Sequence, residues 1–390
     1  MRFPGFEGEW KWHKLGDIAN ISKGFGISKD QISEKGQSCI LYGELYTKYK
    51  SEVIQTILSR TDINFPNLVK SKANDVIIPS SGETAIDIAT ARCVPFSDVL
   101  LGGDLNIIRL ENDNGVFLSY QLNGVRKHDI AKIAQGISVV HLYGEGLKKL
   151  KIAICSNEEQ KKIASFLYLI DERISTQNKI IEDLKLLKST IREKIFSCQL
   201  KFKDDKGNNF PKWESKKIRE IADITMGQSP DSSSYNNNND GFPLIQGNAD
   251  ISRRKSDPRQ YTTEPTKHCN IGDILLTVRA PVGYVAKAKH KACIGRGICA
   301  IKNNNLSISE FIYQFLLYFE DKWSCLEQGS TFSSVSSSDI QTLSIKMPCL
   351  EEQNKIVNFL SSIETKTDIE IQILQEYGKQ KKHLMSNLFI

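Results

Sequence analysis

The sequence predicts an α+β protein in which two copies of one globular domain are separated by two long helices that form an antiparallel coiled coil. Three observations predict this. Residues 134–196 align without gaps on residues 327–389, each aligned stretch carries a heptad pattern, and the remaining segments contain short apolar runs broken by Gly, Pro and Asn. The predicted boundaries are 1–150 and 199–345 for the globular domains, with helices in 151–198 and 346–390.

The repeat is clearest at the ends of each copy. Gln135-Gly136 recurs as Gln328-Gly329, and Glu158-Glu159-Gln160 recurs as Glu351-Glu352-Gln353. The starts also correspond, since the segment from Trp10 to Gly24 resembles that from Trp213 to Gly227. Between these ends the two copies no longer align residue by residue and share only a pattern of short apolar runs. A shared frame around unlike contents is expected when one scaffold carries two different binding surfaces.

The first predicted helix, residues 158–196, contains neither Gly nor Pro, and Ser156-Asn157 supplies a helix cap. An apolar stripe on so long a helix must be buried, and its own repeat is the obvious partner. Each helix follows its own globular domain, so the pairing is expected to be antiparallel. The polar residues Gln177, Lys188, Glu370 and Lys381 also fall on this seam. The residues expected to pair the helices are Ile163, Leu167, Ile170, Ile174, Ile181, Leu184, Ile191, Ile356, Leu360, Ile363, Leu374, Leu384 and Leu388.

Within the globular domains, apolar runs predict strands and amphipathic runs predict short helices. Strands are expected at 76–79, 106–110 and 275–278, and helices at 117–122 and 310–319. Two polar stretches, 232–240 and 333–338, predict mobile loops.

Composition excludes several classes of protein. The chain has 390 residues and 40% apolar residues, but its longest apolar runs fall far short of the roughly 20 residues that cross a bilayer. The first residues lack the apolar core of a secretion signal. Nine cysteines, an odd number without a Cys-x-x-Cys pair, favour reduced thiols. We therefore expect a cytoplasmic protein without a membrane partner, and no His/Cys spacing predicts a metal site.

Familiar catalytic motifs are missing from the sequence. It contains no phosphate-binding Gly-x-x-x-x-Gly-Lys-Ser/Thr loop, no Gly-x-Ser-x-Gly elbow, no tetrapeptide of the amino-methyltransferases and no glycine fingerprint for a cofactor. These absences together favour a binding protein over an enzyme, with no catalytic residue and no cofactor bound by the chain itself.

The strongest charge feature is a basic window in the second globular domain. Residues 251–296 hold ten Lys or Arg and three Asp or Glu, whereas the whole chain has a net charge of +6. Basic side chains neutralise DNA phosphates, and Arg, Asn and Gln can contact base edges. A solvated basic face is the alternative. The candidate DNA-binding residues here are Gln246, Asn248, Arg253, Arg254, Lys255, Arg259, Arg279, Lys287, Lys289 and Arg296.

The first globular domain is nearly neutral by comparison. Residues 35–92 contain seven basic and six acidic side chains. A polar and aromatic string could stack on bases and form hydrogen bonds with them, although a half-exposed strand would have the same pattern. The candidates in this domain are Tyr42, Glu44, Tyr46, Lys48, Lys50, Ser80 and Ser81.

Several motifs in combination carry a family resemblance. Trp-x-x-x-x-Leu-x-Asp-Ile begins at Trp10 and recurs from Trp213 with Ile and Glu at the variable places. The string 40–45 (ILYGEL), the string 279–283 (RAPVG), the two Gln-Gly loops and the Glu-Glu-Gln-x-Lys-Ile start of each helix follow in order. The chain resembles the specificity subunit of Type I restriction-modification systems. One departure is Cys155, which stands where the second copy has Pro348.

The resemblance implies two target recognition domains, each reading one half of a bipartite site in double-stranded DNA. The helices would set the distance between the half-sites and dock two modification subunits. Methylation, translocation and cleavage would belong to the modification and restriction subunits, which would bind S-adenosylmethionine, ATP and Mg²⁺. Two alternatives are a coiled-coil scaffold joining two protein-binding domains and a degenerate methyltransferase. Steep salt dependence of binding would distinguish a DNA-binding protein from the scaffold.

Overall fold

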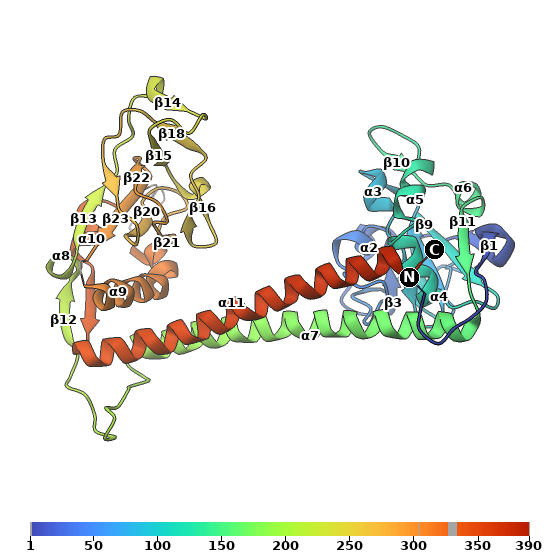
Figure 1. Ribbon diagram of the computed structural model, residues 1–390, viewed down its shortest axis with the longest axis horizontal. Helices are drawn as coiled ribbons and strands as arrows, with labels where there is room; N and C mark the ends of the chain where they lie inside the picture. The colour runs from blue at the N-terminus through green and yellow to red at the C-terminus, as the bar shows by residue number, and fades with distance from the viewer. Residues whose placement is uncertain (1, 304, 327–333, 390) are drawn as a thin grey trace. The chain divides into compact units, whose positions relative to one another are not determined.

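The computed structural model describes residues 2–303, 305–326 and 334–389. It divides into two compact units, of which the first comprises Met1–Ile180 with Glu370–Ile390 and the second Ile181–Ile369. Each long helix, α7 (Asn157–Phe196) and α11 (Leu350–Asn387), contributes to both units. Figure 1 shows the mixture of strands and helices, which confirms the predicted α+β class.

The first unit is built on a four-stranded antiparallel sheet in the order β2-β9-β5-β7 within the described residues. Its core joins Val76, Ile78 and Ile108 to Leu118 and Leu122 of a covering helix. The main sheet and helix are β2 (Ala19–Lys23), β5 (Asp75–Pro79), β7 (Arg92–Val94), β9 (Leu105–Leu110) and α4 (Gly115–Asn123). The smaller sheets are β3 (Gln37–Ile40) with β4 (Ser59–Thr61) and β8 (Leu100–Leu101), β1 (Lys11–Lys14) with β11 (Lys151–Ile154), and β6 (Ser81–Gly82) with β10 (Val140–His141). The other helices are α1 (Leu15–Ile18), η1 (Lys29–Gln31), α2 (Glu44–Thr47), α3 (Ala85–Ile88), α5 (Lys127–Ile133) and α6 (Gly144–Lys148).

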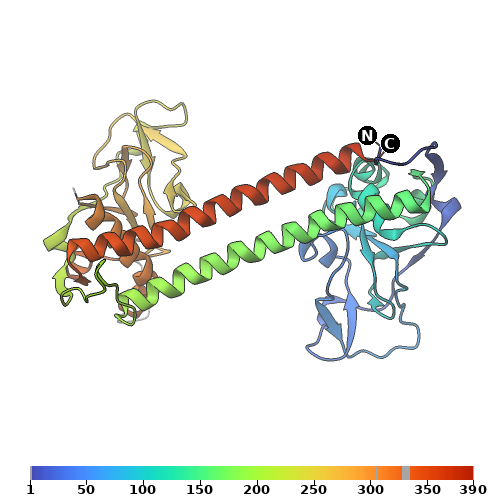
Figure 2. The same ribbon diagram turned by 60° about the horizontal axis from the view of Figure 1, so that its bottom comes forward.

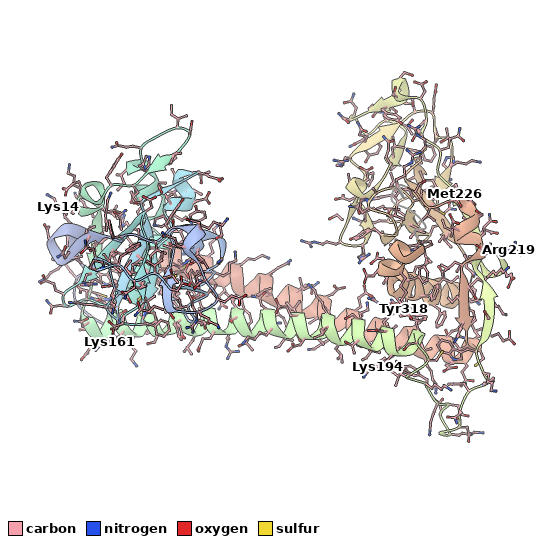
Figure 3. All side chains as sticks on the ribbon, turned by 180° about the vertical axis from the view of Figure 1, so that it is seen from behind. Lys14, Lys161, Lys194, Arg219, Met226 and Tyr318 are labelled. Atoms are coloured by element: carbon pink, nitrogen blue, oxygen red, sulfur yellow. The ribbon has the colours of Figure 1, made fainter. Side chains whose placement is uncertain are left out.

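The second unit has a main sheet in the order β13-β23-β20-β21-β17-β16 across its described residues. These strands are β13 (Asp223–Met226), β16 (Ile251–Ser252), β17 (Lys255–Ser256), β20 (Ile274–Thr277), β21 (Val285–Lys287) and β23 (Ile298–Lys302). A second sheet contains β14 (Tyr235–Asn236), β15 (Phe242–Ile245), β18 (Gln260–Thr262), β19 (His268–Cys269) and β22 (Ala292–Ile294), and β12 (Glu214–Lys217) pairs with β24 (Ser344–Met347). The helices are α8 (Ile218–Ile221), η2 (Ser232–Ser234), η3 (Asn248–Asp250), α9 (Leu306–Phe319), η4 (Glu320–Leu326) and α10 (Ser337–Thr342). Tyr318 of α9, labelled in Figure 3, stacks on Phe196 at the end of α7 with ring centroids 5.5 Å apart.

The repeat in the sequence is also a repeat of topology. The order β2-β9-β5-β7 recurs as β13-β23-β20-β21, the pair β1-β11 recurs as β12-β24, and β3, β4 and β8 correspond to β15, β18 and β22. Close packing explains why glycine occupies the matching positions 24 and 227 at the ends of the repeated segments 10–24 and 213–227. A Cβ at either would lie 2.0 or 2.2 Å from a backbone carbonyl oxygen, so only glycine fits.

The shared Glu-Glu-Gln motif fixes the start of each long helix. The Gln160 side chain donates to the Cys155 carbonyl at 3.0 Å, and Gln353 donates to the Pro348 carbonyl at 2.8 Å. The Ser156 hydroxyl accepts from the Glu159 backbone N–H at 3.3 Å, which confirms the predicted cap. The substitution of proline by Cys155 therefore leaves the helix start intact, because the motif binds only a backbone carbonyl there.

The two polar stretches predicted as loops are partly ordered secondary structure. Residues 232–236 form η2 and β14, because the Asp231 side chain caps η2 through the Ser233 N–H at 2.9 Å. In the other stretch, the Ser336 side chain accepts from the Asp339 N–H and caps α10. Serine-rich sequence forms caps as readily as loops. Residue 333 and the second Gln-Gly loop, 328–329, lie outside the described residues.

The long helices run antiparallel where they meet. In the first unit, Ile163, Leu167 and Ile170 near the start of α7 share a core with Met385 and Leu388 at the end of α11. Figures 1 and 2 show these segments side by side. In the second unit, Ile195 at the end of α7 shares a core with Ile356 and Leu360 at the start of α11. Of the remaining predicted pairing residues, Ile181 and Ile363 are buried, whereas Ile174, Leu184, Ile191, Leu374 and Leu384 are half-buried.

Polar pairs in the seam follow the repeat. Lys381 forms an ion pair with Asp171 at 2.5 Å, and Lys188 forms one with Glu364 at 2.7 Å. The 193-residue shift converts each pair into the other, so both copies carry the same contact. The Gln177 side chain donates to the Glu370 carbonyl at 3.1 Å and also contacts its carboxylate, and these residues are 193 positions apart. In an antiparallel pair of repeats, a residue meets its own equivalent only at the centre of the pairing.

Candidate nucleic-acid interface

Most of the candidate DNA-binding residues lie on one equivalent connection in the two copies. In the first unit, Tyr42 to Lys50 lie between β3 and β4, and in the second, Gln246 to Arg259 lie between the corresponding strands β15 and β18. A second connection, β5–β7 or β20–β21, carries Ser80 and Ser81 in one copy and Arg279 in the other. The sequence alone placed these residues separately, and the shared topology brings them to corresponding places.

Arginine side chains tie the two connections together in both copies. Arg92, at the start of β7, donates to the carbonyls of Leu45 at 3.1 Å and Tyr49 at 2.9 Å. In the second unit, Arg254 donates to the Val285 carbonyl of β21 at 3.1 Å. The two connections therefore form one surface in each unit.

Three candidates of the first unit lie inside the fold. Glu44 is 5% exposed, and its carboxylate accepts from the Leu41 backbone N–H at 3.1 Å and from Lys48 at 2.6 Å. Ser80 and Ser81 are also buried. Glu44 thus holds the β3–β4 connection in shape, and Lys48 is committed to it.

The accessible candidates of the first unit are aromatic or lysine side chains. Tyr42 and Tyr46 are half-buried, and Lys50 is exposed. Burial raises the pKa of the Tyr46 hydroxyl, and Tyr42 together with nearby carboxylates raises it further, so Tyr46 is a neutral donor at physiological pH. This surface offers rings and hydrogen bonds rather than a concentration of positive charge.

In the second unit, three predicted contact residues are neutralised within the fold. Arg254 binds Glu320, with Nη2 and Oε2 2.8 Å apart, and Arg259 binds the buried Asp250 at 3.0 Å. Lys287 forms an ion pair with Glu310. The two glutamates lie on η4 and α9, outside residues 251–296. The free positive charge of this segment is therefore smaller than its sequence indicates. No local pattern in the sequence could have identified them.

Other cations of the window remain exposed. Within the described part of the chain, seven exposed basic residues of the window form no ion pair, and these are Arg253, Lys255, Lys267, Arg279, Lys289, Lys291 and Arg296. Asn248 is exposed, and Gln246 is half-buried with its backbone N–H bound to Asp250 at 2.8 Å. The motif at 279–283 begins with Arg279 and contains a cis Ala280–Pro281 bond and Gly283, whose Cβ position is occupied by Trp323. A set of cations around amide side chains can bind an anionic polymer and contact bases.

The described residues contain neither a candidate metal centre nor a candidate membrane span. They contain no group of three His, Cys, Asp or Glu side chains able to hold a metal ion. Among them, no helix combines the length and apolar character that a membrane span requires. The eight cysteines described are unpaired.

Comparison with known proteins identifies the family. Residues 7–186 and 211–377 both match the model of the type I restriction modification DNA specificity domain. The MjaX type I restriction enzyme specificity subunit of Methanocaldococcus jannaschii is 34% identical over 305 residues, covering 75% of this chain and 72% of that protein. The MjaVIII subunit of the same organism is 24% identical over 411 residues, covering 97% and 92%. The chain therefore belongs to the family of type I restriction-modification specificity subunits and carries the recognition domain twice.

Solved structures agree on the fold. A chain from a study of complex assembly in a type I restriction-modification system has a TM-score of 0.66 at 22% identity, with 97% of each chain covered. The S subunit from M. genitalium has a TM-score of 0.61 at 17% identity, covering 100% of this chain and 99% of that one. The prediction of a specificity subunit is confirmed over the alternative of a protein-binding scaffold.

Proposed function

We propose that the two recognition domains each bind one half of a bipartite site in double-stranded DNA. The observation that carries this proposal is the shared connection between equivalent strands, which holds unlike side chains in the two copies. Identical frames with different contact residues suit the recognition of two different sequences. In the second unit the proposed contacts are Gln246, Asn248, Arg253, Lys255, Arg279, Lys289 and Arg296, and in the first they are Tyr42 and Tyr46, because the ammonium of Lys50 is bound to the Thr47 carbonyl.

The long helices supply the proposed spacer and the docking surface for partners. At about 1.5 Å per residue, the 40 residues of α7 extend about 60 Å. After the seam is formed, both helices still expose large apolar side chains, which favour protein contact: Leu169, Ile180, Leu186, Leu187, Ile369 and Ile373. Because the repeat duplicates the helices, we expect two modification subunits.

The remaining chemistry is assigned to those partners. Modification and restriction subunits would bind S-adenosylmethionine, ATP and Mg²⁺ and carry out methylation, translocation and cleavage. This chain would act without catalytic residues, in the cytoplasm, as the subunit that selects the site.

A matched heptad insertion tests both parts of the proposal. One heptad is inserted in α7 between Leu184 and Leu187, and another in the facing stretch of α11 between Ile363 and Thr367. The added length of about 10 Å should lengthen the DNA spacer by about 3 base pairs and leave both half-sites unchanged. Sequencing of methylated genomic DNA from cells that express the complex gives both the spacer length and the half-site sequences.

An insertion in α7 alone is the control and should disrupt helix pairing and assembly. An unchanged spacer in the double insertion would refute the spacer role, and methylation without a two-part target would refute bipartite recognition.

A further inference from the structure

The hairpin β16–β17 has a turn that its sequence does not favour. Ile251 faces Ser256 and Ser252 faces Lys255, which leaves Arg253 and Arg254 as the two turn residues. Both have positive φ, 49° and 62°. Turns of this kind are usually made by Asn-Gly or Gly-Gly, because residues with a Cβ are strained there. Two arginines are costly in this conformation.

Arg254 is held at several points. Its guanidinium forms a two-point ion pair with Glu320, donates to the Val285 carbonyl and lies 4.2 Å from the ring centre of Tyr284. Glu320 also accepts from the Val285 backbone N–H at 2.7 Å. The hairpin forms the edge of the main sheet, and these contacts fasten it to the neighbouring strand β21.

Arg253 has the opposite environment. Its side chain is exposed, and among the described residues it forms no ion pair. It lines a groove of about 500 Å³ together with three other basic residues, Arg254, Lys255 and Lys287. The groove also contains Asn358 and Ser361 of α11 and the carboxylates of Glu310, Glu364 and Asp368. The turn holds the backbone of Arg253 at the hairpin tip, so its guanidinium, beside Lys255, can bind a phosphate at little backbone entropy cost.

The first unit has no such hairpin in its described residues. The corresponding connection between β3 and β4 forms helix α2, held by the buried Glu44. The strained turn is therefore an addition to the second copy and is not required by the shared frame. Persistent strain outside the frame points to function.

We propose that Arg253 contacts a DNA phosphate and that Arg254 is a positioning residue that keeps the strained turn in place. The inference rests on the proposed DNA-binding function and assigns different roles to two neighbouring arginines. Arg254 acts through Arg253 and makes no phosphate contact of its own.

Salt titration of the assembled complex tests this division. The full chain, bound to its modification subunit, is titrated with a DNA duplex of mixed sequence at several salt concentrations. Arg253→Ala should lower the slope of log affinity against log salt by about 0.9, the value of one phosphate contact. Arg254→Ala should produce a similar loss, and the double variant should be no weaker than Arg253→Ala alone. Arg254→Lys, which retains the charge without the two-point geometry, should restore part of the loss.

Arg219→Ala is the matched control. Arg219 is an exposed arginine on α8, at the other edge of the second unit from β16, as Figures 1 and 3 show. Its removal should leave the slope unchanged. Additive losses in the Arg253 and Arg254 variants would mean two independent phosphate contacts and overturn the positioning role. An unchanged slope in Arg253→Ala, while the unaltered complex binds with steep salt dependence, would overturn the phosphate contact. Failure of the unaltered complex to bind DNA would instead count against the proposed function.

Arg253→Gly separates the contact from folding. Glycine accepts positive φ without strain, so this variant should unfold at a higher temperature than the unaltered chain while losing the same salt slope. Loss of both thermal stability and affinity would show that Arg253 supports the fold, contrary to the proposal.

Discussion

The two recognition domains share a frame but differ in the connection that it presents. Between β3 and β4, residues 41–58 carry two lysines and two glutamates, and one of each is joined in the Glu44–Lys48 pair. Between β15 and β18, residues 246–259 carry four basic and two acidic side chains and form a strained hairpin. The frame tolerates both because the strands on either side keep their order. Duplication has thus preserved the packing and varied the charge of the surface.

Each unit also has a groove beside one of its long helices, and the two grooves differ in lining. A groove of about 910 Å³ in the first unit includes Lys161, Ala164 and Ser165 of α7, with Lys161 labelled in Figure 3. The groove of about 500 Å³ in the second unit includes the equivalent positions of α11, 354, 357 and 358. The remaining wall contains Pro95 and Phe96 in the first case, and in the second it contains four basic side chains together with Glu310 and Tyr313. The helix surface is repeated, whereas the wall from the recognition domain is not.

The two copies should differ most in how much one repeated ion pair contributes to the free energy of unfolding. Lys381 is 13% exposed and contacts two buried carboxylates, Asp171 and Glu52. Among the residues that the structure describes, its equivalent Lys188 forms an ion pair with Glu364 alone, whose side chain is 49% exposed. Lys381→Ala should reduce the free energy of unfolding by about 3–5 kcal/mol, because it removes the lysine that neutralises two buried carboxylates. Lys188→Ala should cost less than about 1 kcal/mol. Urea unfolding measures both, with hydrogen exchange identifying the affected unit, and equal losses would contradict the difference in burial.

The Lys381→Ala variant should also acquire a distinctive pH dependence. Burial raises the pKa of Glu52, an effect that Lys381 partly opposes, so removing Lys381 should raise this pKa further. The folded variant then holds a proton that the unfolded chain releases. Its stability should therefore fall as pH rises from the ordinary glutamate pKa through the raised value, and recover as pH is lowered. Urea midpoints across this range should show a larger pH dependence in Lys381→Ala than in Lys188→Ala, which keeps the native surroundings of Glu52.

Removal of the central polar pair, Gln177 and Glu370, should change the free energy of unfolding less than Lys381→Ala does, and in the opposite direction. Replacing both Gln177 and Glu370 by Leu exchanges a buried polar contact for apolar packing, which should leave stability unchanged or raise it by about 1–4 kcal/mol. Single polar contacts in such seams fix register, so the double variant should tolerate slipped pairings. Thermal unfolding measures the first effect, and a broader range of methylated spacers would reveal the second. A lower melting temperature with one unchanged spacer would show that the pair serves stability alone.

Regular features were predictable from the sequence because they depend on neighbouring residues. The run 76–79 forms the centre of β5, and the heptads from Ile163 and Ile356 are buried where the helices meet. The candidate surface was only partly predictable. Whether Arg254 is available to DNA depends on Glu320, which is 66 residues away and reaches it only through the fold. Burial of Glu44 is likewise set by tertiary packing rather than by its polar surroundings in the sequence.

The smallest predicted difference is in the salt dependence of DNA binding when one lysine is removed from each recognition surface. Lys50 is exposed, but its ammonium donates to the Thr47 carbonyl at 3.0 Å in a nearly neutral connection. Lys289 is exposed within the basic window. Lys50→Ala should leave the salt slope of DNA binding unchanged, whereas Lys289→Ala should lower it by about 0.9. Titration of the assembled complex at several salt concentrations measures both. Equal losses would mean that the first domain binds phosphates as strongly as the second, and that its near neutrality is offset by how its few cations are placed. If only Lys289 matters, the first domain must hold DNA mainly through base contacts and stacking.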